Sequence, residues 1–242
     1  MPKAFFIDTS RCTACRGCQV ACKEWHEHQA VPTLQRGTHQ NPPDFTPYNY
    51  KIVRFSEHKI DGKIKWLFFP DQCRHCLVPP CKDAADAYVP GAIVQDEATG
   101  AVLYTDKTKQ LTIDQAREVR DVCPYAIPVR SEATGMLSKC DWCIDRQRAG
   151  LKPACVKTCC TGSMNIGERA DMLALARRTL EKVKKTHPEA TLLDEDYLAV
   201  IYLITEPRKL YHEFAERREQ MNPMTRQAFL AMMARPASRL RG

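Results

Sequence analysis

The residues best suited to chemistry in this sequence are its cysteines, of which there are thirteen among 242 residues. Four of them form a tight run near the N-terminus: Cys12, Cys15, Cys18 and Cys22. With two-residue spacers, three successive thiolates can reach three irons of a cuboidal [4Fe-4S] cluster, and a fourth thiolate three residues later reaches a neighbouring cluster. Structural zinc normally takes its ligands from two separated pairs. The run therefore predicts an iron–sulfur site.

Three further locations carry the remaining ligand-like cysteines, and two of them are incomplete in complementary ways. One run has Cys73, Cys76 and Cys81, with Ala85 where a fourth ligand would fall. Another keeps only its last member, Cys123, followed by the proline that usually ends such a run. The places of its first three ligands hold apolar residues: Ile113, Ala116 and Val119. The last run is complete, with eleven residues inserted between its second and third ligands: Cys140, Cys143, Cys155 and Cys159.

The fourth cysteine of such a run ligates the other cluster of its pair, and this rule divides twelve cysteines into three sets of four. The sets are Cys12, Cys15, Cys18 and Cys159; Cys22, Cys140, Cys143 and Cys155; and Cys73, Cys76, Cys81 and Cys123. A fourth set would need Ala85 and the three apolar residues named above, so one whole site is missing while its partner is intact. We therefore predict three [4Fe-4S] clusters. Cys160 is left over, and we expect it to be a small, buried or half-buried free thiol.

Cations lie close to the predicted ligands. Seven of them stand within one or two residues of a ligand: Arg11, Arg16, Lys23, Arg74, Lys82, Lys139 and Lys157. A nearby cation stabilises the more negative reduced state of a cluster and raises its potential, so these residues are candidates for tuning. The alternative for each is a solvated loop position, since Lys and Arg are mostly exposed. We interpret His75, inside the Cys73–Cys76 loop, as a hydrogen-bonding or exposed neighbour and not as a ligand.

The composition argues against several other classes of protein. A content of 44% hydrophobic residues supports a real core, yet no apolar run approaches the roughly 18 to 20 residues that span a bilayer. Disulfide frameworks are typical of small secreted chains, and residues 1–8 lack the features of a secretory signal. The formal charge of +7 falls to roughly +1 if each cluster adds about two negative charges, so we expect no nucleic-acid partner. The protein either stays in the cytoplasm or is carried out by a partner.

Short strand-like pieces lie between the cysteine runs. Residues 50–55 with 64–69, and 92–96 with 101–105, each read as a hairpin. Residues 112–122 have a helical pattern, and the proline-rich segment 28–47 reads as an extended surface connection. After residue 167 the cysteines stop. There we expect helices at 169–185, 207–219 and 224–234, and a strand at 198–205.

Together these patterns predict an α+β fold. Two bacterial-ferredoxin-like units related by pseudo-symmetry would comprise residues 1–48 with 124–167, holding two clusters, and residues 49–123, holding one. Residues 168–242 would form a mainly helical, partner-binding extension. The sequence has no Walker loop, no dinucleotide-binding glycine motif and no informative pair of catalytic carboxylates. We therefore expect no catalytic residue in this chain and a role in electron transfer.

The order of these runs, together with several short motifs, resembles the electron-transfer β subunits of molybdopterin oxidoreductases. The resemblance covers about residues 4–167, and its motifs are CRHC from Cys73, PPC from Pro79, CPYAIP from Cys123 and ACVKTC from Ala154. Four-cluster members include the β subunits of membrane-bound formate dehydrogenase, nitrate reductase and dimethyl sulfoxide reductase. By lacking one cluster and the C-terminal membrane helix, and by its opening from Ala4 to Trp25, the sequence is similar to the small subunit of soluble periplasmic formate dehydrogenases of sulfate-reducing bacteria.

The resemblance implies partners and a location. The large subunit would carry tungsten or molybdenum on a bis-pterin cofactor, and electrons from formate would enter at the Cys12 set. They would leave through the Cys73 set to a multihaem cytochrome c. Export with a large subunit that carries its own signal would give a periplasmic location, with the cytoplasm as the alternative. Two other functions stay open: the same role in another molybdopterin oxidoreductase, and a zinc-stabilised binding module.

Overall fold

A four-stranded sheet joins the two ends of the described chain. The structure is a computed structural model that describes residues 2–215. The sheet has the strand order β8-β1-β10-β9, with β1 at Lys3–Asp8, β8 at Met164–Glu168, β9 at Thr191–Leu193 and β10 at Val200–Ile204. Strand β1 runs parallel to β10 and antiparallel to β8. The first strand of the chain is therefore held between strands that come more than 150 residues later.

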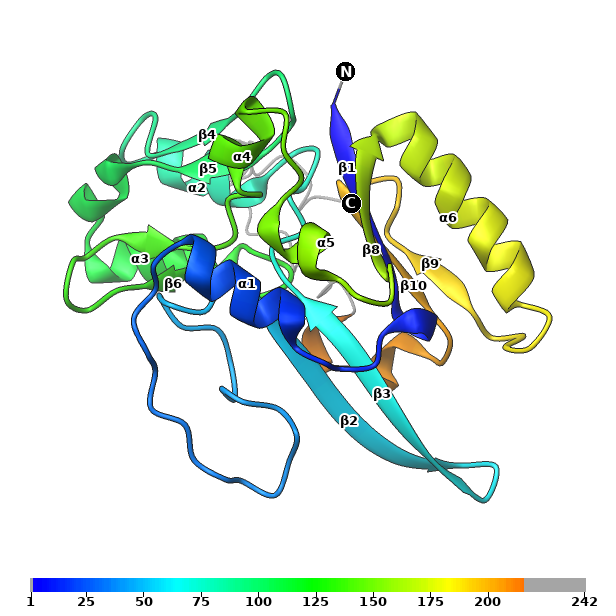
Figure 1. Ribbon diagram of the computed structural model, residues 1–242. Helices are drawn as coiled ribbons and strands as arrows, with labels where there is room; N and C mark the ends of the chain where they lie inside the picture. The colour runs from blue at the N-terminus through cyan, green and yellow to red at the C-terminus, as the bar shows by residue number, and fades with distance from the viewer. Residues whose placement is uncertain (1, 216–242) are drawn as a thin grey trace, which may run out of the picture.

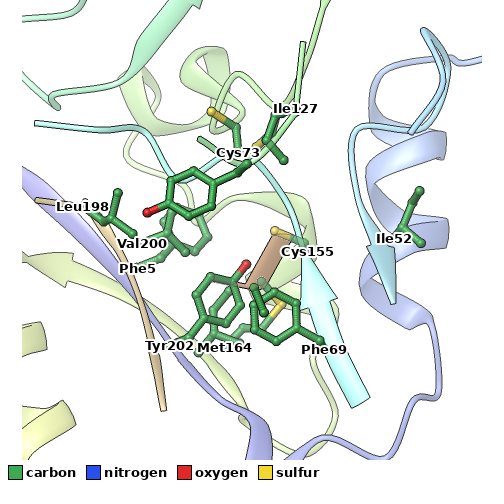
Figure 2. Packing of buried hydrophobic residues seen from close by; sticks show 14 of the residues in the cluster. Phe5, Ile52, Phe69, Cys73, Ile127, Cys155, Met164, Leu198, Val200 and Tyr202 are labelled. Atoms are coloured by element: carbon green, nitrogen blue, oxygen red, sulfur yellow. The ribbon is translucent and has the colours of Figure 1, made fainter. Parts of the chain in front are cut away.

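The two central strands bury both faces of this sheet. Successive side chains of a strand point to opposite faces, so Phe6 and Ile201 meet helix α6 (Arg169–Val183) while Phe5 and Tyr202 face the other way. Figure 1 shows α6 on one side of the sheet and the short helices on the other. In Figure 2, Phe5 and Tyr202 lie in the same apolar cluster as Cys73 and Cys155. The sheet thus forms one wall of the region that holds the cysteines.

A long hairpin extends from this region. Its strands are β2 (Ile52–Ile60) and β3 (Lys63–Asp71), paired antiparallel over their whole length. The turn residues Asp61 and Gly62 both have positive φ, at 50° and 77°, which matches the twist that a two-residue hairpin turn needs. The inner end is buried around Ile52 and Phe69, whereas the tip projects away from the other elements (Figure 1).

The remaining elements are short and surround the cysteines. They are helices α1 (Gly17–Trp25), α2 (Pro80–Asp86), α3 (Ile113–Asp121), α4 (Ile144–Arg148) and α5 (Ala154–Thr158), and strands β4 (Ile93–Gln95), β5 (Val102–Tyr104), β6 (Val129–Arg130) and β7 (Leu137–Ser138). Short 3₁₀ turns occupy Thr9–Arg11, Asp106–Gln110, Arg208–Leu210 and Glu213–Ala215. None of the helices within residues 2–215 is long and apolar enough to cross a membrane.

Most predicted elements are confirmed, with small shifts of their ends. Both hairpins are present, as β2–β3 and β4–β5, and the helix predicted at 112–122 is α3. Thr112 starts this helix with a reciprocal capping box to Gln115, the arrangement that satisfies two free N–H groups at a helix start. The helix predicted at 169–185 is α6, the strand predicted at 198–205 is β10, and residues 28–47 form no regular element. The α+β class is confirmed.

The helix predicted at 207–219 is wrong over its described part. Residues 208–215 form two 3₁₀ turns, because the carbonyl oxygen of Leu210 accepts hydrogen bonds from Ser56 Oγ at 2.6 Å and the ring of His58 at 2.7 Å. The hydroxyl of Tyr211 is likewise bonded to the backbone N–H of Thr205, at 3.0 Å. Contacts to the hairpin and the sheet thus replace helical bonds. Residues 216–219 of this predicted helix, and the whole helix predicted at 224–234, lie outside the described residues.

The segment after residue 167 contributes to the four-stranded sheet. It contributes α6, β9 and the central strand β10. The division into two cluster-binding units and a partner-binding extension stays a prediction.

Apolar side chains pack where the fourth iron–sulfur site was predicted to be missing. Ala85 of α2 and Ala116 and Val119 of α3 are buried together in a separate cluster, completed by Ala92, Ile93, Val102, Leu111 and Leu137. Ile113 differs, since it is 62% exposed at the start of α3. Packing of α2 against α3 therefore occupies the region around three of the four positions.

Candidate metal centres

The first candidate centre is an enclosed cavity between β3 and α3. Its cysteines are Cys73, Cys76, Cys81 and Cys123, which come from the loop after β3, the start of α2 and the end of α3. Arg74, Tyr104 and Lys139 also line it. Three of the four thiols are buried, and Cys76 is half-buried. The fold thus brings Cys123 to three cysteines that lie more than 40 residues earlier in the sequence.

The second candidate centre is a cavity beside the hairpin. It is lined by Cys12, Cys15, Cys18 and Cys159, with Val53, Pro70 and Met164 as its apolar walls. The loop before α1 and its first turn supply three of these thiols, and the end of α5 supplies the fourth. Cys18 is buried, whereas Cys15 is exposed. This centre therefore reaches the molecular surface.

The third candidate centre lies in the interior between α1 and α5. Its four cysteines, Cys22, Cys140, Cys143 and Cys155, are all buried. Burial raises the pKa of Cys140, and the neighbouring thiolates of Cys22, Cys155 and Cys143 raise it further, as does Asp141. The four sulfurs are therefore close neighbours. Their grouping, like that of the other two centres, is the one given by the fourth-ligand rule.

Three of the CxxC loops share one backbone feature: those at Cys12–Cys15, Cys73–Cys76 and Cys140–Cys143. The residue just before the second cysteine has a left-handed conformation in each, with φ of 52° at Ala14, 45° at His75 and 63° at Trp142. This region is unfavourable for residues other than glycine. It turns the backbone so that the N–H of His75 lies 3.4 Å from Cys73 Sγ and that of Trp142 lies 3.5 Å from Cys140 Sγ. Such N–H groups stabilise a thiolate, as a metal ligand requires.

The protonation of these thiols also fits a metal site. Burial is the largest cause that raises the pKa of Cys18, Cys81 and Cys143, each to about 12, and of Cys123 to about 11. Negative charge on neighbouring thiols adds to the effect. Four thiolates crowded in an apolar cavity are therefore unstable unless a cation compensates them. Four sulfur donors suit a [4Fe-4S] cluster.

The seven candidate tuning cations fall into two classes. Arg74 and Lys139 are buried and line the cavity of the Cys73 set. Arg74 pairs with Asp71 at 2.6 Å and lies over the rings of Phe69, Tyr125 and Tyr202. Lys139 donates to the carbonyl oxygens of Val102 and Cys140. The other five lie at or near the surface: Arg11, Arg16, Lys23, Lys82 and Lys157.

Sequence reasoning missed two residues that approach the sulfurs. Lys51 is only 2% exposed. Burial opposes its charge, but the thiolates of Cys18, Cys155 and Cys140 outweigh that cost and raise its pKa. The other residue is His26, whose Nε2 lies 3.7 Å from Cys143 Sγ and 3.3 Å from Asp141. For Lys51, the one available signal in the sequence was its position directly before the apolar pair Ile52-Val53.

The expectation for Cys160 is wrong in its burial. This thiol is exposed, and its sulfur lies 3.8 Å from that of Cys15. Helix α5 ends at Thr158, and the chain then runs along the surface to a turn at Gly162. His75 was expected to be either a hydrogen-bonding or an exposed neighbour of the ligands. It is buried and hydrogen-bonded. Its Nδ1 accepts the N–H of Val102 at 2.9 Å, and its ring stacks on Trp142 at 4.4 Å.

Comparison with known proteins places this geometry in a family. Residues 64–169 match the family model described as a 4Fe-4S dicluster domain. The chain is 55% identical over 216 residues to formate dehydrogenase 2 subunit beta (cytochrome c-553) of Nitratidesulfovibrio vulgaris, covering 89% of this chain and 99% of that one. It is 53% identical to the formate dehydrogenase subunit beta of Megalodesulfovibrio gigas, again over 89% and 99% of the two chains.

A more distant relative is the nitrate-inducible formate dehydrogenase iron–sulfur subunit of Escherichia coli, 37% identical over 75% of this chain and 59% of that one. These matches confirm the resemblance given by the cysteine runs, the [4Fe-4S] chemistry and the role in electron transfer. This protein belongs to the family of formate dehydrogenase beta subunits, which are iron–sulfur proteins.

Proposed function

We propose that this chain relays electrons between the catalytic subunit of a formate dehydrogenase and an external c-type cytochrome, using three [4Fe-4S] clusters as carriers. The observation that carries the proposal is the gathering of twelve cysteines into three groups of four, two in cavities and one in the interior. Bound clusters would supply one-electron redox chemistry without a change of bonding in the protein. The residues of the chain then have three tasks.

The first task is to hold the sulfurs, and the left-handed loop residues with their N–H groups support it. The second is to keep water away, which the apolar walls around Phe5, Val53 and Tyr202 serve. The third is to compensate charge, for which Lys51, Arg74 and Lys139 are buried near the thiols. Cluster potentials depend on hydrogen bonds to sulfur, net charge and exposure, so these tasks also set the direction of electron flow.

The proposed partners rest on the family resemblance and on the names of the relatives. The proposed catalytic subunit carries tungsten or molybdenum on a bis-pterin cofactor, and the proposed acceptor is a multihaem or other c-type cytochrome, since one relative has cytochrome c-553 in its name. A periplasmic location for the complex rests on the same relatives. Two units would hold the clusters. The unit of residues 1–48 with 124–167 would hold two clusters, and the unit of residues 49–123 would hold one.

The test is the composition and activity of the purified native complex. We expect this chain to contribute about twelve irons and twelve labile sulfides, from four of each per cluster. We also expect formate to reduce an artificial dye through the complex. A value near eight irons would contradict the three-cluster assignment, and a complex that reduces the dye with another substrate but not with formate would contradict the assigned reaction.

The alternative within the same chemistry is service to a different molybdopterin enzyme. The relation to a subunit of the anaerobic dimethyl sulfoxide reductase of Escherichia coli is weaker, at 28% identity over 67% of the present sequence, which favours formate dehydrogenase. A zinc-stabilised module is disfavoured because each group draws three of its thiols from one run, unlike paired zinc ligands. Zinc without visible absorption in the purified protein would revive it.

A further inference from the structure

The three cysteine groups differ in how close they come to solvent. All four thiols of the Cys22 group are buried, whereas Cys15 of one outer group is exposed and Cys76 of the other is half-buried. Lys51 interacts with Cys18 of the Cys12 group and with Cys155 and Cys140 of the buried group. The groups therefore form a path with a buried middle and two ends near the surface. With clusters bound in all three groups, the two outer groups would be the points at which electrons enter and leave.

The end at Cys76 has the form of a docking surface. We call the Cys76 face the patch formed by Cys76, Val78, Asp83, Asp196 and Tyr197. Val78 is 77% exposed and Tyr197 62% exposed, and both line a surface cavity of about 440 Å³ that reaches the Cys76 side chain. An exposed apolar pair directly over a half-buried ligand gives a partner close access to the electron carrier.

Backbone bonds hold this face in place. Cys76 forms a β-bridge with Leu198, and the N–H of Leu77 donates to the carbonyl oxygen of Tyr197 at 2.9 Å. The loop with Val78 and the segment with Tyr197 are thereby fixed to each other although they lie more than 100 residues apart. A preformed surface loses little entropy on binding.

The charge of the face differs from that of the whole chain. The formal net charge is +7, yet the charged side chains that line the cavity within the described part of the chain are the carboxylates of Asp83 and Asp196. Of the cations near these residues, Lys82 pairs with Asp86 and Arg208 with Asp194. Arg169 donates to the carbonyl oxygens of Glu195 and Leu198 and also interacts with Asp196, but it does not line the cavity. The opposite end of the path has arginines beside it, Arg11 and Arg16, near Cys15. The two ends therefore favour partners of opposite charge.

We propose that the Cys76 face is where the external electron acceptor docks, and that the acceptor presents an exposed cofactor edge within an apolar patch ringed by lysines. This inference rests on the proposed function and adds the surface and the charge of the partner. A small apolar centre with a charged rim is typical of weak, transient redox complexes. The charged rim steers association, and the apolar centre brings the cofactors together. Changing a rim charge should therefore alter mainly the association rate.

The experiment uses the native complex with Asp83→Lys and Asp196→Lys combined. Formate-driven reduction of a lysine-rimmed c-type cytochrome is compared with reduction of a small neutral dye, and the readout is the ratio of the two rates. At low salt we expect the ratio to fall about tenfold. The unsubstituted complex should slow as salt rises, and the variant should not. Asp114→Lys, on the exposed start of α3 away from this face, is the matched control and should leave both rates unchanged.

Two further measurements separate charge from contact. Acetylating the lysines of the same cytochrome removes their charge, and it should slow the unsubstituted complex by a similar factor without slowing the variant further. Val78→Ser should lower the cytochrome rate at all salt concentrations, while Ile64→Ser at the hairpin tip, also exposed, should not.

The docking inference is overturned if the double charge reversal leaves both the rate ratio and its salt dependence unchanged. It is also overturned if that variant no longer co-purifies with the catalytic subunit while Asp114→Lys does, because the face would then belong to the subunit interface. Failure of the proposed function is a separate result. In that case even the unsubstituted complex would not reduce the dye with formate.

Discussion

The side-chain nitrogen of Lys51 donates a hydrogen bond to the amide oxygen of Gln72 at 2.6 Å, in a position where Lys51 is only 2% exposed. A second bond, at 3.2 Å, goes to the carbonyl oxygen of Pro70. Neither partner is charged, so the compensating negative charge must come from elsewhere. The thiolates of Cys18 and Cys155 supply it. Through them Lys51 interacts electrostatically with both the Cys12 group and the buried Cys22 group.

We predict that Lys51→Met lowers the midpoint potentials of the clusters at the Cys18 and Cys155 groups. Removing a buried positive charge disfavours the added electron by about 1 kcal/mol or more, which corresponds to tens of millivolts. Lys51→Arg keeps the charge and is the control, with a much smaller shift expected. Potentiometric titration followed by EPR measures the effect. Equal shifts in the two variants would show that packing, and not charge, is responsible.

The set that joins Cys123 to the Cys73 run can be tested by iron content. Cys123→Ser should lower the iron of the chain from about twelve to about eight, because one cluster loses a ligand that lies far away in the sequence. Cys160→Ser is the control and should retain about twelve. If both variants, or neither, lose iron, the division of the thirteen cysteines is wrong.

The cysteine runs made the centres predictable because ligand spacing is a local property of the chain. The fourth-ligand rule also links each run to another and so predicts the grouping of distant thiols, which stays a prediction. Lys51 was not predictable, because its role depends on the hairpin bringing residue 51 close to both Cys18 and Cys155. The exposure of Cys160 depends on where the chain turns after α5, which the spacing of ligands does not determine.

The fold was predictable to a similar extent. Both hairpins and the helices at 112–122 and 169–185 have local periodic patterns, and those predictions were confirmed. The first strand, Lys3–Asp8, was missed because its apolar run is short and its partners lie at residues 164–168 and 200–204. The helix expected from Pro207 failed because Ser56 and His58 of the hairpin bind the carbonyl of Leu210. Such long-range bonds leave no trace in local propensity.

The packed region around Ala116 gives a prediction about the missing fourth site. Ala116→Cys should create no new cluster signal in EPR and no added iron, because Ala85 and Val119 still offer no ligand and α2 and α3 pack closely there. The new thiol should behave as a buried, unreactive side chain. A fourth cluster in this single variant would contradict the crosswise assignment of ligands.

A buried ion network supports the Cys73 loop, and breaking it should destabilise the protein. Asp71 is bonded to Arg54 at 2.8 Å and to Arg74 at 2.6 Å, with all three side chains almost fully buried. Asp71→Asn leaves the buried Arg74 without its counter-ion and Arg54 with only the partly exposed Asp44, at a cost of about 3 to 5 kcal/mol. For a chain of this size we expect the melting temperature of the complex to fall by roughly 6 to 20 °C.

Asp114 provides the comparison for this network, since it forms an ion pair with Arg117 on the surface of α3. Exposed pairs contribute at most about 1 kcal/mol, so Asp114→Asn should change the melting temperature by only a few degrees. Similar losses in the two variants would mean that burial of the Asp71 network adds nothing to its stabilising effect.

The 3.8 Å separation of the Cys15 and Cys160 sulfurs predicts a competing reaction in the chain without clusters. Both thiols are exposed, so an added disulfide such as oxidised glutathione can accept their two electrons while the two sulfurs lose their protons and join. The bond would remove Cys15 as a ligand and block that centre.

After such treatment, the unsubstituted chain should regain about eight irons on reconstitution and Cys160→Ser about twelve. Reduction with a dithiol before reconstitution should return the unsubstituted chain to about twelve irons. Peptide mass analysis would identify the Cys15–Cys160 link directly. Equal recovery of iron by the two chains, with no such link, would show that the neighbouring thiols do not react with each other.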